Sequence, residues 1–182
     1  MKNKPKILFI SGSPRNGNTD FALSKIYDSI DNNHKELIFL KDQDIKFCKG
    51  CLTCHKKPKC VIKDDMGAIL TKMINSDIFV IGTPNYFDNV SGLMKNFIDR
   101  CHPLYKTELV RAKKVILILV GGGKSQGTRK YLSLSFFGFV KYLKLNLINE
   151  YSFQALNPLD LSKNESALKN ISKIAKKINS LC

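Results

Sequence analysis

The sequence predicts an α/β protein with a doubly wound, five-stranded parallel sheet and helices on both faces of that sheet. Short apolar runs alternate along the 182-residue chain with longer segments of helical periodicity. Most of these runs are continuously apolar, as expected of parallel strands that are buried on both faces. In such sheets ligands bind beyond the carboxyl ends of the strands, so the loops that follow the strands are the first places to search.

The five expected strands are short runs rich in Ile, Leu, Val and Phe. In chain order they span residues 6–10 (KILFI), 36–40 (ELIFL), 78–82 (IFVIG), 114–120 (KVILILV) and 145–153 (LNLINEYSF). β-Branched and aromatic side chains favour such strands because they pack well on a pleated surface.

Between and after the strands, apolar residues recur at helical spacing. Helices are expected at about residues 19–33, 66–75, 91–100, 127–143 and 161–181. Asp64 and Asp65 favour the start of the second helix, and Ser91 is placed to cap the third. The last helix presents one apolar stripe, formed by Leu168, Ile171, Ile174, Ala175 and Ile178. Residues 41–63 carry no regular pattern.

The chain has 30 Lys and Arg against 15 Asp and Glu, a net charge of +15. The lysines are spread through the chain and no groove-reading motif accompanies them, so nucleic-acid binding is not expected. The charge favours acidic partners, including phosphates and acidic electron-transfer proteins. No apolar run approaches the roughly 20 residues of a membrane span, and the N-terminal apolar stretch is too short for a signal peptide. We therefore expect a cytoplasmic protein without membrane contact.

Residues 11–19 (SGSPRNGNT) join the first expected strand to the first helix. Free backbone N–H groups at a helix N-terminus favour an anion, and an arginine can add a charge-assisted contact to a phosphate. The segment lacks both the Walker A ending and the GxGxxG pattern, which points to a monophosphate. A tight turn with an N-cap at Asn18 or Thr19 is the alternative interpretation. The predicted phosphate ligands are Ser11, Ser13, Arg15, Asn18 and Thr19.

Gly12-Ser13-Pro14-Arg15, together with Asn18-Thr19, resembles the phosphate loop of the NAD(P)H-dependent FMN reductase and iron–sulfur flavoprotein families. The resemblance covers about residues 6–150 and implies a flavodoxin-like fold that binds FMN. Residues 82–92 resemble the segment that these families place beside the flavin ring. The resemblance implies ring contacts from Pro84, Asn85, Tyr86, Phe87 and Asn89.

Gly121, Gly122 and Gly123 follow the fourth expected strand. Glycines permit close backbone approach to a planar ligand and leave N–H donors unhindered. A flexible turn is the alternative for this run, and aromatic residues filling the core are the alternative for residues 86–87.

Four cysteines, Cys48, Cys51, Cys54 and Cys60, form a C-x2-C-x2-C-x5-C pattern. Compact spacing of this kind suits thiolates around one [4Fe–4S] cluster, and it resembles the cysteine motif of iron–sulfur flavoproteins. Two other interpretations stay open, a zinc site and a metal-free segment. His55 is interpreted as a solvated loop residue, and Cys101 and Cys182 as ordinary thiols.

The chain is thus identified as one flavodoxin-like FMN-binding domain, residues 1–182, with a cysteine-rich insertion at about 45–63. We expect an oxidoreductase that moves electrons between NAD(P)H, bound transiently, or a ferredoxin-like donor and an acceptor. No catalytic side chain is predicted, because flavin chemistry requires no acid–base set. The resemblance also implies a homodimer or homotetramer, with the cluster of one subunit close to the flavin of another. A non-catalytic electron carrier, which the high positive charge disfavours, and a redox sensor are the alternatives.

Overall fold

The computed structural model describes residues 4–182, so residues 1–3 of the predicted 1–182 domain lie outside the described part. Five parallel strands form the sheet in the order β2-β1-β3-β5-β6. They are β1 (Ile7–Ser11), β2 (Lys35–Phe39), β3 (Ile78–Tyr86), β5 (Lys114–Gly121) and β6 (Asn146–Gln154). The chain reverses its direction of travel across the sheet after β2, which confirms the doubly wound topology. The crevice for a ligand therefore lies beyond the carboxyl ends of β1 and β3.

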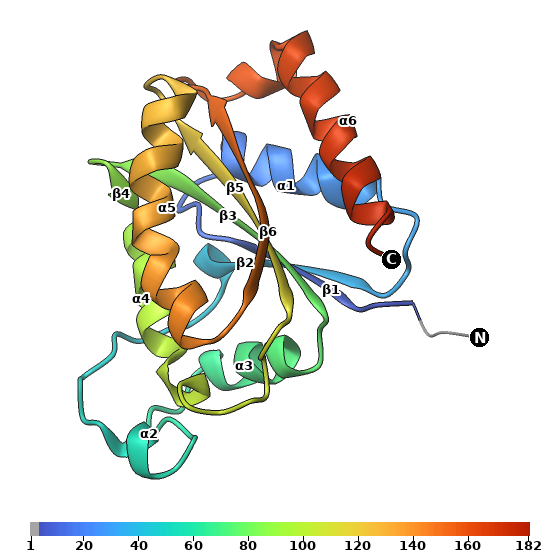
Figure 1. Cartoon of the computed structure of the whole chain (residues 1–182). Coiled ribbons are helices and arrows are strands. Elements are labelled where there is room, and N and C mark those ends of the chain that lie inside the picture. The colour runs from blue at the N-terminus through green and yellow to red at the C-terminus, as the bar shows by residue number, and fades with distance from the viewer. Residues whose placement is uncertain (1–3) are drawn as a thin grey trace.

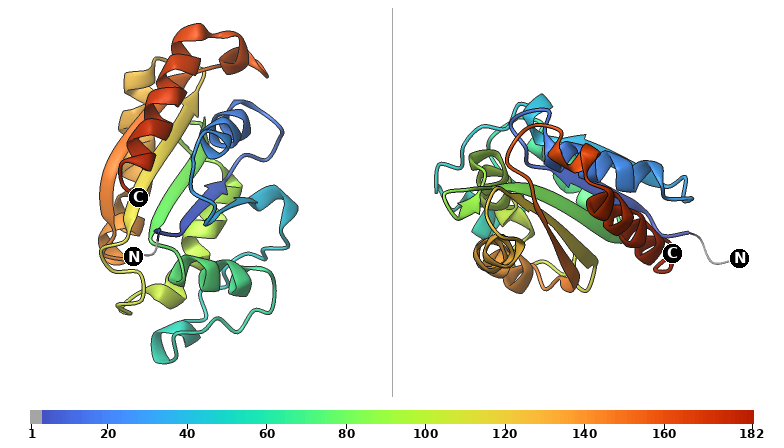
Figure 2. Two further views of the ribbon diagram at one scale, coloured as in Figure 1. Left: turned by 90° about the vertical axis from the view of Figure 1, so that its right-hand side faces the viewer. Right: turned by 90° about the horizontal axis from the view of Figure 1, so that it is seen from above.

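Helices cover both faces of the sheet, as Figures 1 and 2 show. The helices are α1 (Asn18–Asp28), α2 (Thr53–Lys56), α3 (Met66–Ile74), α4 (Gly92–Arg100), α5 (Ser125–Tyr142) and α6 (Glu165–Asn179). Two apolar clusters result, one beneath α1 and α6 and the other beneath α3, α4 and α5. Successive β1 residues, such as Leu8 and Phe9, enter opposite clusters because side chains alternate along a strand. This double burial explains why the strand sequences are continuously apolar.

Strand β3 is longer than expected, and the predicted loop at residues 82–92 begins as a hairpin. Beyond Gly82, Thr83 and Pro84 continue the pairing with β5. Asn85 and Tyr86 then pair with the short antiparallel strand β4 (Asn89–Val90). The apolar pattern ends at Gly82, whereas backbone pairing continues wherever a neighbouring strand is available.

Two helix boundaries also differ from expectation. Helix α1 ends at Asp28 instead of about residue 33, and the N–H groups of the next residues bond back to its last turn. The last helix begins at Glu165, because Asn164 caps it by accepting the N–H of Ala167 at 3.0 Å. Residues Asp160–Lys163 form a separate 3-10 turn, and Leu168 is partly exposed while Ala167 takes the buried position. Ser91 caps α4 as predicted.

Within the described residues, no helix combines the length and apolar character that crossing a membrane requires.

Candidate functional site

A hollow lies beyond the carboxyl ends of β1, β3 and β5, where the doubly wound topology places a ligand. It encloses about 610 Å³ of empty space, including the part open to solvent. Three expected loops and the segment after β6 line it: Ser13, Arg15, Gly17, Asn18, Thr19, Pro84, Asn85, Tyr86, Val120, Gly121, Gly122, Ala155 and Leu156. The fold thus brings together most of the residues predicted from the sequence to contact a cofactor.

The first turn of α1 faces this hollow without a side-chain cap. The N-cap residue is Gly17, so the alternative of a cap at Asn18 or Thr19 is wrong. Both residues belong to the first helical turn, whose N–H groups have no partner within the helix. Arg15 extends from the same loop and is exposed. Uncapped N–H groups and an exposed guanidinium together form an arrangement suited to a phosphate.

Ser11 and Asn18 stabilise the loop through their side chains. Ser11 is fully buried; its hydroxyl donates to Asp20 and accepts the N–H of Ser13 at 3.3 Å. Asp20 in turn pairs with Lys41. The Asn18 amide nitrogen donates to the carbonyl of Asn157 at 2.7 Å, and its oxygen accepts the N–H of Leu161 at 3.1 Å. Of these two residues, Ser11 does not line the hollow, whereas Asn18 does, and the Asn18 side chain ties the loop to the segment after β6.

Two buried oxygens at or next to the opposite wall have no hydrogen-bond partner among the described residues. They are Oδ1 of Asn85, which lines the hollow at the end of β3, and Oγ1 of Thr128, which lies in the first part of α5 and does not itself line the hollow. Gly121 lies between them, because a Cβ there would stand 2.5 Å from Thr128 Oγ1 and 3.0 Å from Asn85 Cβ. Buried polar atoms normally have partners, so an unpaired acceptor at a hollow indicates a ligand that donates hydrogen bonds. Thr128 carries no signal in the sequence that would single it out.

Phe87, Asn89 and Gly123 do not line the hollow. Phe87 and Asp88 form the hairpin tip, both with positive φ (50° and 55°), and Phe87 is fully exposed. A left-handed backbone is unfavourable for a phenylalanine, so the tip is a strained and solvent-facing feature. Asn89 accepts the hydroxyl of Ser135 at 2.9 Å. The roles of these residues as ring contacts stay predictions.

The segment after β6 contributes a wall of the hollow that was not predicted from the sequence. Leu156 lies over Gly122, with its Cδ1 2.7 Å from the position of an added Cβ, and Ala155 donates its N–H to the carbonyl of Gly121 at 2.8 Å. The rule that ligands bind at the carboxyl ends of strands applies to β6 as well as to β1, β3 and β5. Applied to the fifth expected strand, it would have pointed to this segment.

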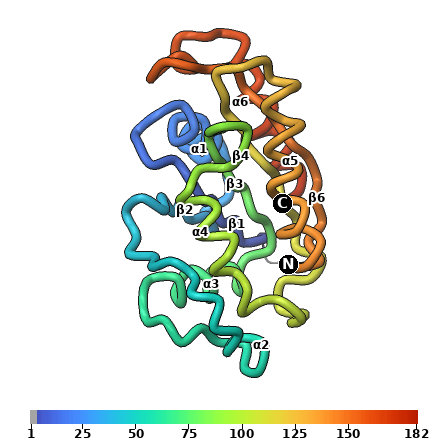
Figure 3. The backbone as a smooth tube through the Cα atoms, turned by 90° about the vertical axis from the view of Figure 1, so that its left-hand side faces the viewer, coloured from blue at the N-terminus to red at the C-terminus, as the bar shows by residue number. Residues whose placement is uncertain are grey.

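The cysteine segment forms a second hollow, of about 490 Å³ including the part open to solvent. All four predicted ligands, Cys48, Cys51, Cys54 and Cys60, line it. Figures 1 and 3 show that this segment, around α2, lies at the lower end of the molecule, well away from β4. Within residues 4–182, no three His, Cys, Asp or Glu side chains are grouped closely enough to hold a metal ion. The four thiols therefore share one hollow without a preformed coordination geometry.

The thiols in this segment differ in their electrostatic surroundings. Hydrogen bonds from the backbone and side chain of Thr53 lower the pKa of Cys51. Burial, followed by the proximity of Cys60 and the other cysteines, raises the pKa of Cys54. Mutual repulsion of this kind is expected of thiolates gathered around one centre, and a metal would relieve it. The donor set of four thiols fits an iron–sulfur cluster in its chemistry.

The histidines next to the cysteines form a stacked pair. The His55 ring stacks on His102 at 4.5 Å between centroids, and His102 Nδ1 lies 3.6 Å from Cys54 Sγ. His55 is exposed, as expected, but it is held by this stacking. Cys101 is buried, which raises its pKa well above the ordinary value, while Cys182 is exposed. Neither Cys101 nor Cys182 lines the cysteine hollow.

Comparisons with known proteins agree with the loop motifs. Residues 5–154 match the family described as NADPH-dependent FMN reductase. The chain is similar to an iron-sulfur flavoprotein of Archaeoglobus fulgidus, with 40% identity over 132 residues, which cover 71% of this chain and 65% of that protein. The match thus spans just under two thirds of the length of the curated relatives. The resemblance inferred from the sequence is confirmed.

Solved structures with the same fold support the topology. An NAD(P)H:quinone oxidoreductase from Methanothermobacter marburgensis aligns with a TM-score of 0.75 at 11% identity, covering 97% of this chain and 98% of that one. An FMN-dependent NADH-azoreductase from Bacillus anthracis, in complex with FMN, aligns with a TM-score of 0.70 at 18% identity, covering 96% and 99%. At these identities the likeness concerns the fold, and it confirms the flavodoxin-like architecture.

Proposed function

Because the chain belongs to the NADPH-dependent FMN reductase family, we propose that it is an FMN-dependent oxidoreductase. In this proposal residues 1–182 act as one FMN-binding domain with a cysteine-rich insertion at 45–63. NAD(P)H or a ferredoxin-like protein supplies electrons, and a separate acceptor takes them. The strongly basic surface favours an acidic protein donor, because charge complementarity accelerates association.

The observation that carries the proposal is the hollow at the carboxyl ends of β1 and β3. Its two walls match the two halves of FMN. The first turn of α1 and Arg15 offer hydrogen-bond donors and positive charge to a phosphate. The opposite wall offers the unpaired oxygen of Asn85 and the half-exposed face of Tyr86 to a planar, nitrogen-rich ring.

Bound FMN would supply the redox chemistry, accepting an electron pair from the donor and passing it to the acceptor. The residues of this chain would bind and orient it. Arg15 would neutralise the phosphate, Asn85 would accept a ring N–H, and Gly121 would let the backbone approach the ring edge. Leu156 would close the side of the hollow and keep water from part of the ring.

We further propose that the four cysteines hold one [4Fe–4S] cluster. The family relatives named iron-sulfur flavoproteins and the shared hollow of four thiols support it. The flavin hollow and the cysteine hollow share no lining residue, and the cysteine segment around α2 lies well away from the end of β3 at β4 (Figure 3). Electron transfer between the two sites would therefore run between chains, which favours a homodimer or homotetramer.

The flavin proposal predicts that Arg15→Ala weakens FMN binding by about tenfold, roughly 1.4 kcal/mol, while riboflavin affinity stays unchanged. The physical reason is that riboflavin lacks the phosphate that the guanidinium would contact. Titrations that follow flavin fluorescence measure both affinities. Rapid NAD(P)H oxidation with an added acceptor would separate an enzyme from a passive carrier.

Arg111→Ala is the matched control, because Arg111 is also exposed, pairs with Glu108, and lies outside the flavin hollow. It removes the same charge and should leave the ratio of FMN to riboflavin affinity unchanged. An equal loss for both ligands in Arg15→Ala would refute the phosphate contact. A wild-type protein that takes up no FMN would refute the function.

The cluster proposal predicts close to four iron and four sulfide per chain after anaerobic reconstitution, as the formula [4Fe–4S] requires. Cys51→Ser should reduce the iron content severely, because hydroxyl oxygen is a poor ligand for this cluster. Cys182→Ser is the control, since Cys182 is exposed but lies outside the hollow. Iron near zero in the wild type, or uptake of zinc alone, would contradict the cluster.

A further inference from the structure

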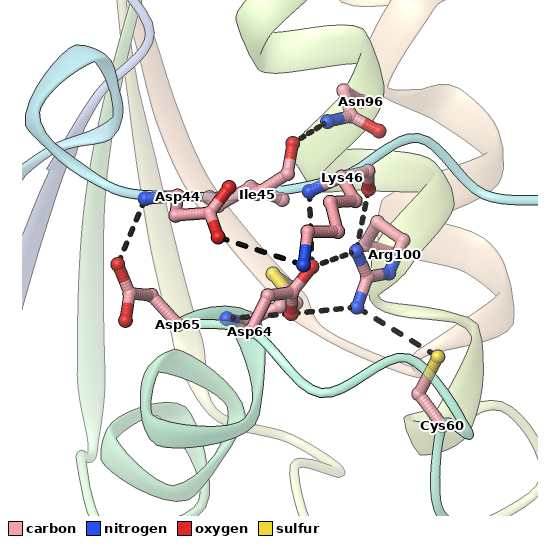
Figure 4. A network of polar contacts seen from close by, with 9 residues as sticks. Asp44, Ile45, Lys46, Cys60, Asp64, Asp65, Asn96 and Arg100 are labelled. Atoms are coloured by element: carbon pink, nitrogen blue, oxygen red, sulfur yellow. Dashed lines mark hydrogen bonds and ion pairs between the residues drawn. The ribbon is translucent and has the colours of Figure 1, made fainter.

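A buried arginine closes the base of the cysteine segment, as Figure 4 shows. Arg100, the last residue of α4, donates from Nη1 and Nη2 to the carboxylate of Asp64 at 2.6 and 2.9 Å. Nη1 also donates to the carbonyl of Lys46. Lys46 precedes the first cysteine and Asp64 follows the last one. One guanidinium therefore holds both ends of the segment that carries the four thiols.

The same guanidinium also reaches one of the predicted ligands. Nη2 of Arg100 lies 3.7 Å from Cys60 Sγ, within reach of a hydrogen bond to sulfur. Arg100 and Cys60 line the hollow that the other three cysteines share. Because arginine stays protonated in proteins, this contact places a positively charged N–H donor beside the Cys60 sulfur.

Stability alone does not explain an arginine at this place. The side chains of Arg100 and Asp64 are 1% and 0% exposed, and a buried ion pair of this kind adds little over a well-packed apolar pair. Arg100 Nε is moreover buried with no acceptor among the described residues, which adds a further cost. A neutral side chain already holds the same segment against α4 nearby, because Asn96 donates to the carbonyl of Ile45 at 2.9 Å.

We propose that Arg100 is a positioning residue for the cysteine site, which orients the sulfur of Cys60 toward the cluster and raises the reduction potential of the bound cluster. This inference rests on the cluster proposed above. Reduction adds one electron, and therefore one negative charge, without breaking a bond. A cationic N–H donor beside a ligand sulfur stabilises the reduced state more than the oxidised state.

Arg100→Lys tests the contact with Cys60 directly. A single ammonium can still pair with Asp64, but it lacks the planar fork that reaches Asp64, Lys46 and Cys60 at once. The cluster should still assemble, and its one-electron reduction should become about tenfold less favourable, a potential about 59 mV more negative. Anaerobic titration with dithionite, followed by electron paramagnetic resonance, measures this shift.

Arg100→Met combined with Asp64→Asn removes both buried charges together, and the potential should fall in the same direction. Asn96→Ala is the matched control, because it loosens the base of the same segment without touching Cys60. The reduction potential of the cluster in Asn96→Ala should equal that of the wild type. Unchanged potentials in both Arg100 variants, or an equal shift in Asn96→Ala, would overturn the proposal.

A measurement on the wild type covers the case in which the variants do not fold. With ¹⁵N-labelled arginine, pulsed electron paramagnetic resonance of the reduced cluster should reveal a weakly coupled nitrogen, and its absence would refute the contact. FMN affinity should be equal in all variants, since Arg100 lies outside the flavin hollow. A wild type that binds FMN but assembles no cluster would overturn this inference and leave the flavin function intact.

Discussion

Arg100→Met is expected to lower the free energy of unfolding by about 3–5 kcal/mol, because it leaves the Asp64 carboxylate buried without its partner. Urea denaturation followed by circular dichroism measures the loss. Combining the change with Asp64→Asn should restore most of the stability, since no unpaired charge then remains. A double variant as unstable as the single one would show that the guanidinium stabilises the fold through contacts other than this pair.

The loss of unfolding free energy in Arg100→Met should depend on pH. Burial is the largest single influence on the pKa of Asp64 and raises it. The hydrogen bonds and charge of Arg100, together with the N–H groups of Lys46 and Met66, outweigh burial and lower that pKa below the ordinary value. A group with a depressed pKa in the folded state contributes stability above its unfolded pKa, and that contribution disappears as the pH falls through the folded pKa. The difference in the free energy of unfolding between wild type and Arg100→Met should therefore become smaller in acid. A difference that stays constant with pH would contradict the pairing of Arg100 with an ionised Asp64 as its cause.

Gly121→Ala is expected to weaken FMN binding by roughly tenfold or more, about 1.4 kcal/mol, and to destabilise the protein by about 1–3 kcal/mol. The added methyl group would stand 2.5 Å from Thr128 Oγ1 and 3.0 Å from Asn85 Cβ. Thr128 cannot easily rotate away, because a β-branched side chain in a helix has few rotamers. Flavin titration and thermal unfolding of the apoprotein measure the two effects separately.

Gly123→Ala provides the control within the same run of glycines. A Cβ at residue 123 would meet no atom within 4 Å, and its φ is not in the left-handed region. Both the affinity and the stability should stay close to those of the wild type. Equal losses in the two variants would mean that the whole glycine run must flex, and the crowding at Gly121 would no longer explain the result.

The local pattern of the sequence sufficed for the elements and for the loops that carry the flavin hollow. Continuous apolar runs indicated buried parallel strands, and the hydroxyl-rich segment after β1 indicated an anion site. The predicted boundaries of the strands and helices were less accurate than their order. Thr83 and Pro84 extend β3 because β5 lies beside them, which no pattern within residues 78–86 reveals.

Pairings between distant residues were beyond the sequence. Asn18 bonds to Asn157, 139 positions away, and so its side chain supports the loop. Leu156 lines the flavin hollow, and Thr128 lies against Gly121, only because α5 and the segment after β6 meet at the same edge of the sheet.

The sequence by itself determined the doubly wound fold class, the placing of the hydroxyl-rich loop at residues 11–19 after β1 and the grouping of four cysteines within one segment, because each depends on neighbours along the chain. Only the tertiary structure decided that Arg100 would meet Asp64, 36 positions away, and Cys60, 40 positions away. The order of strands across the sheet brings such side chains together, and hydrophobic periodicity carries no record of that order.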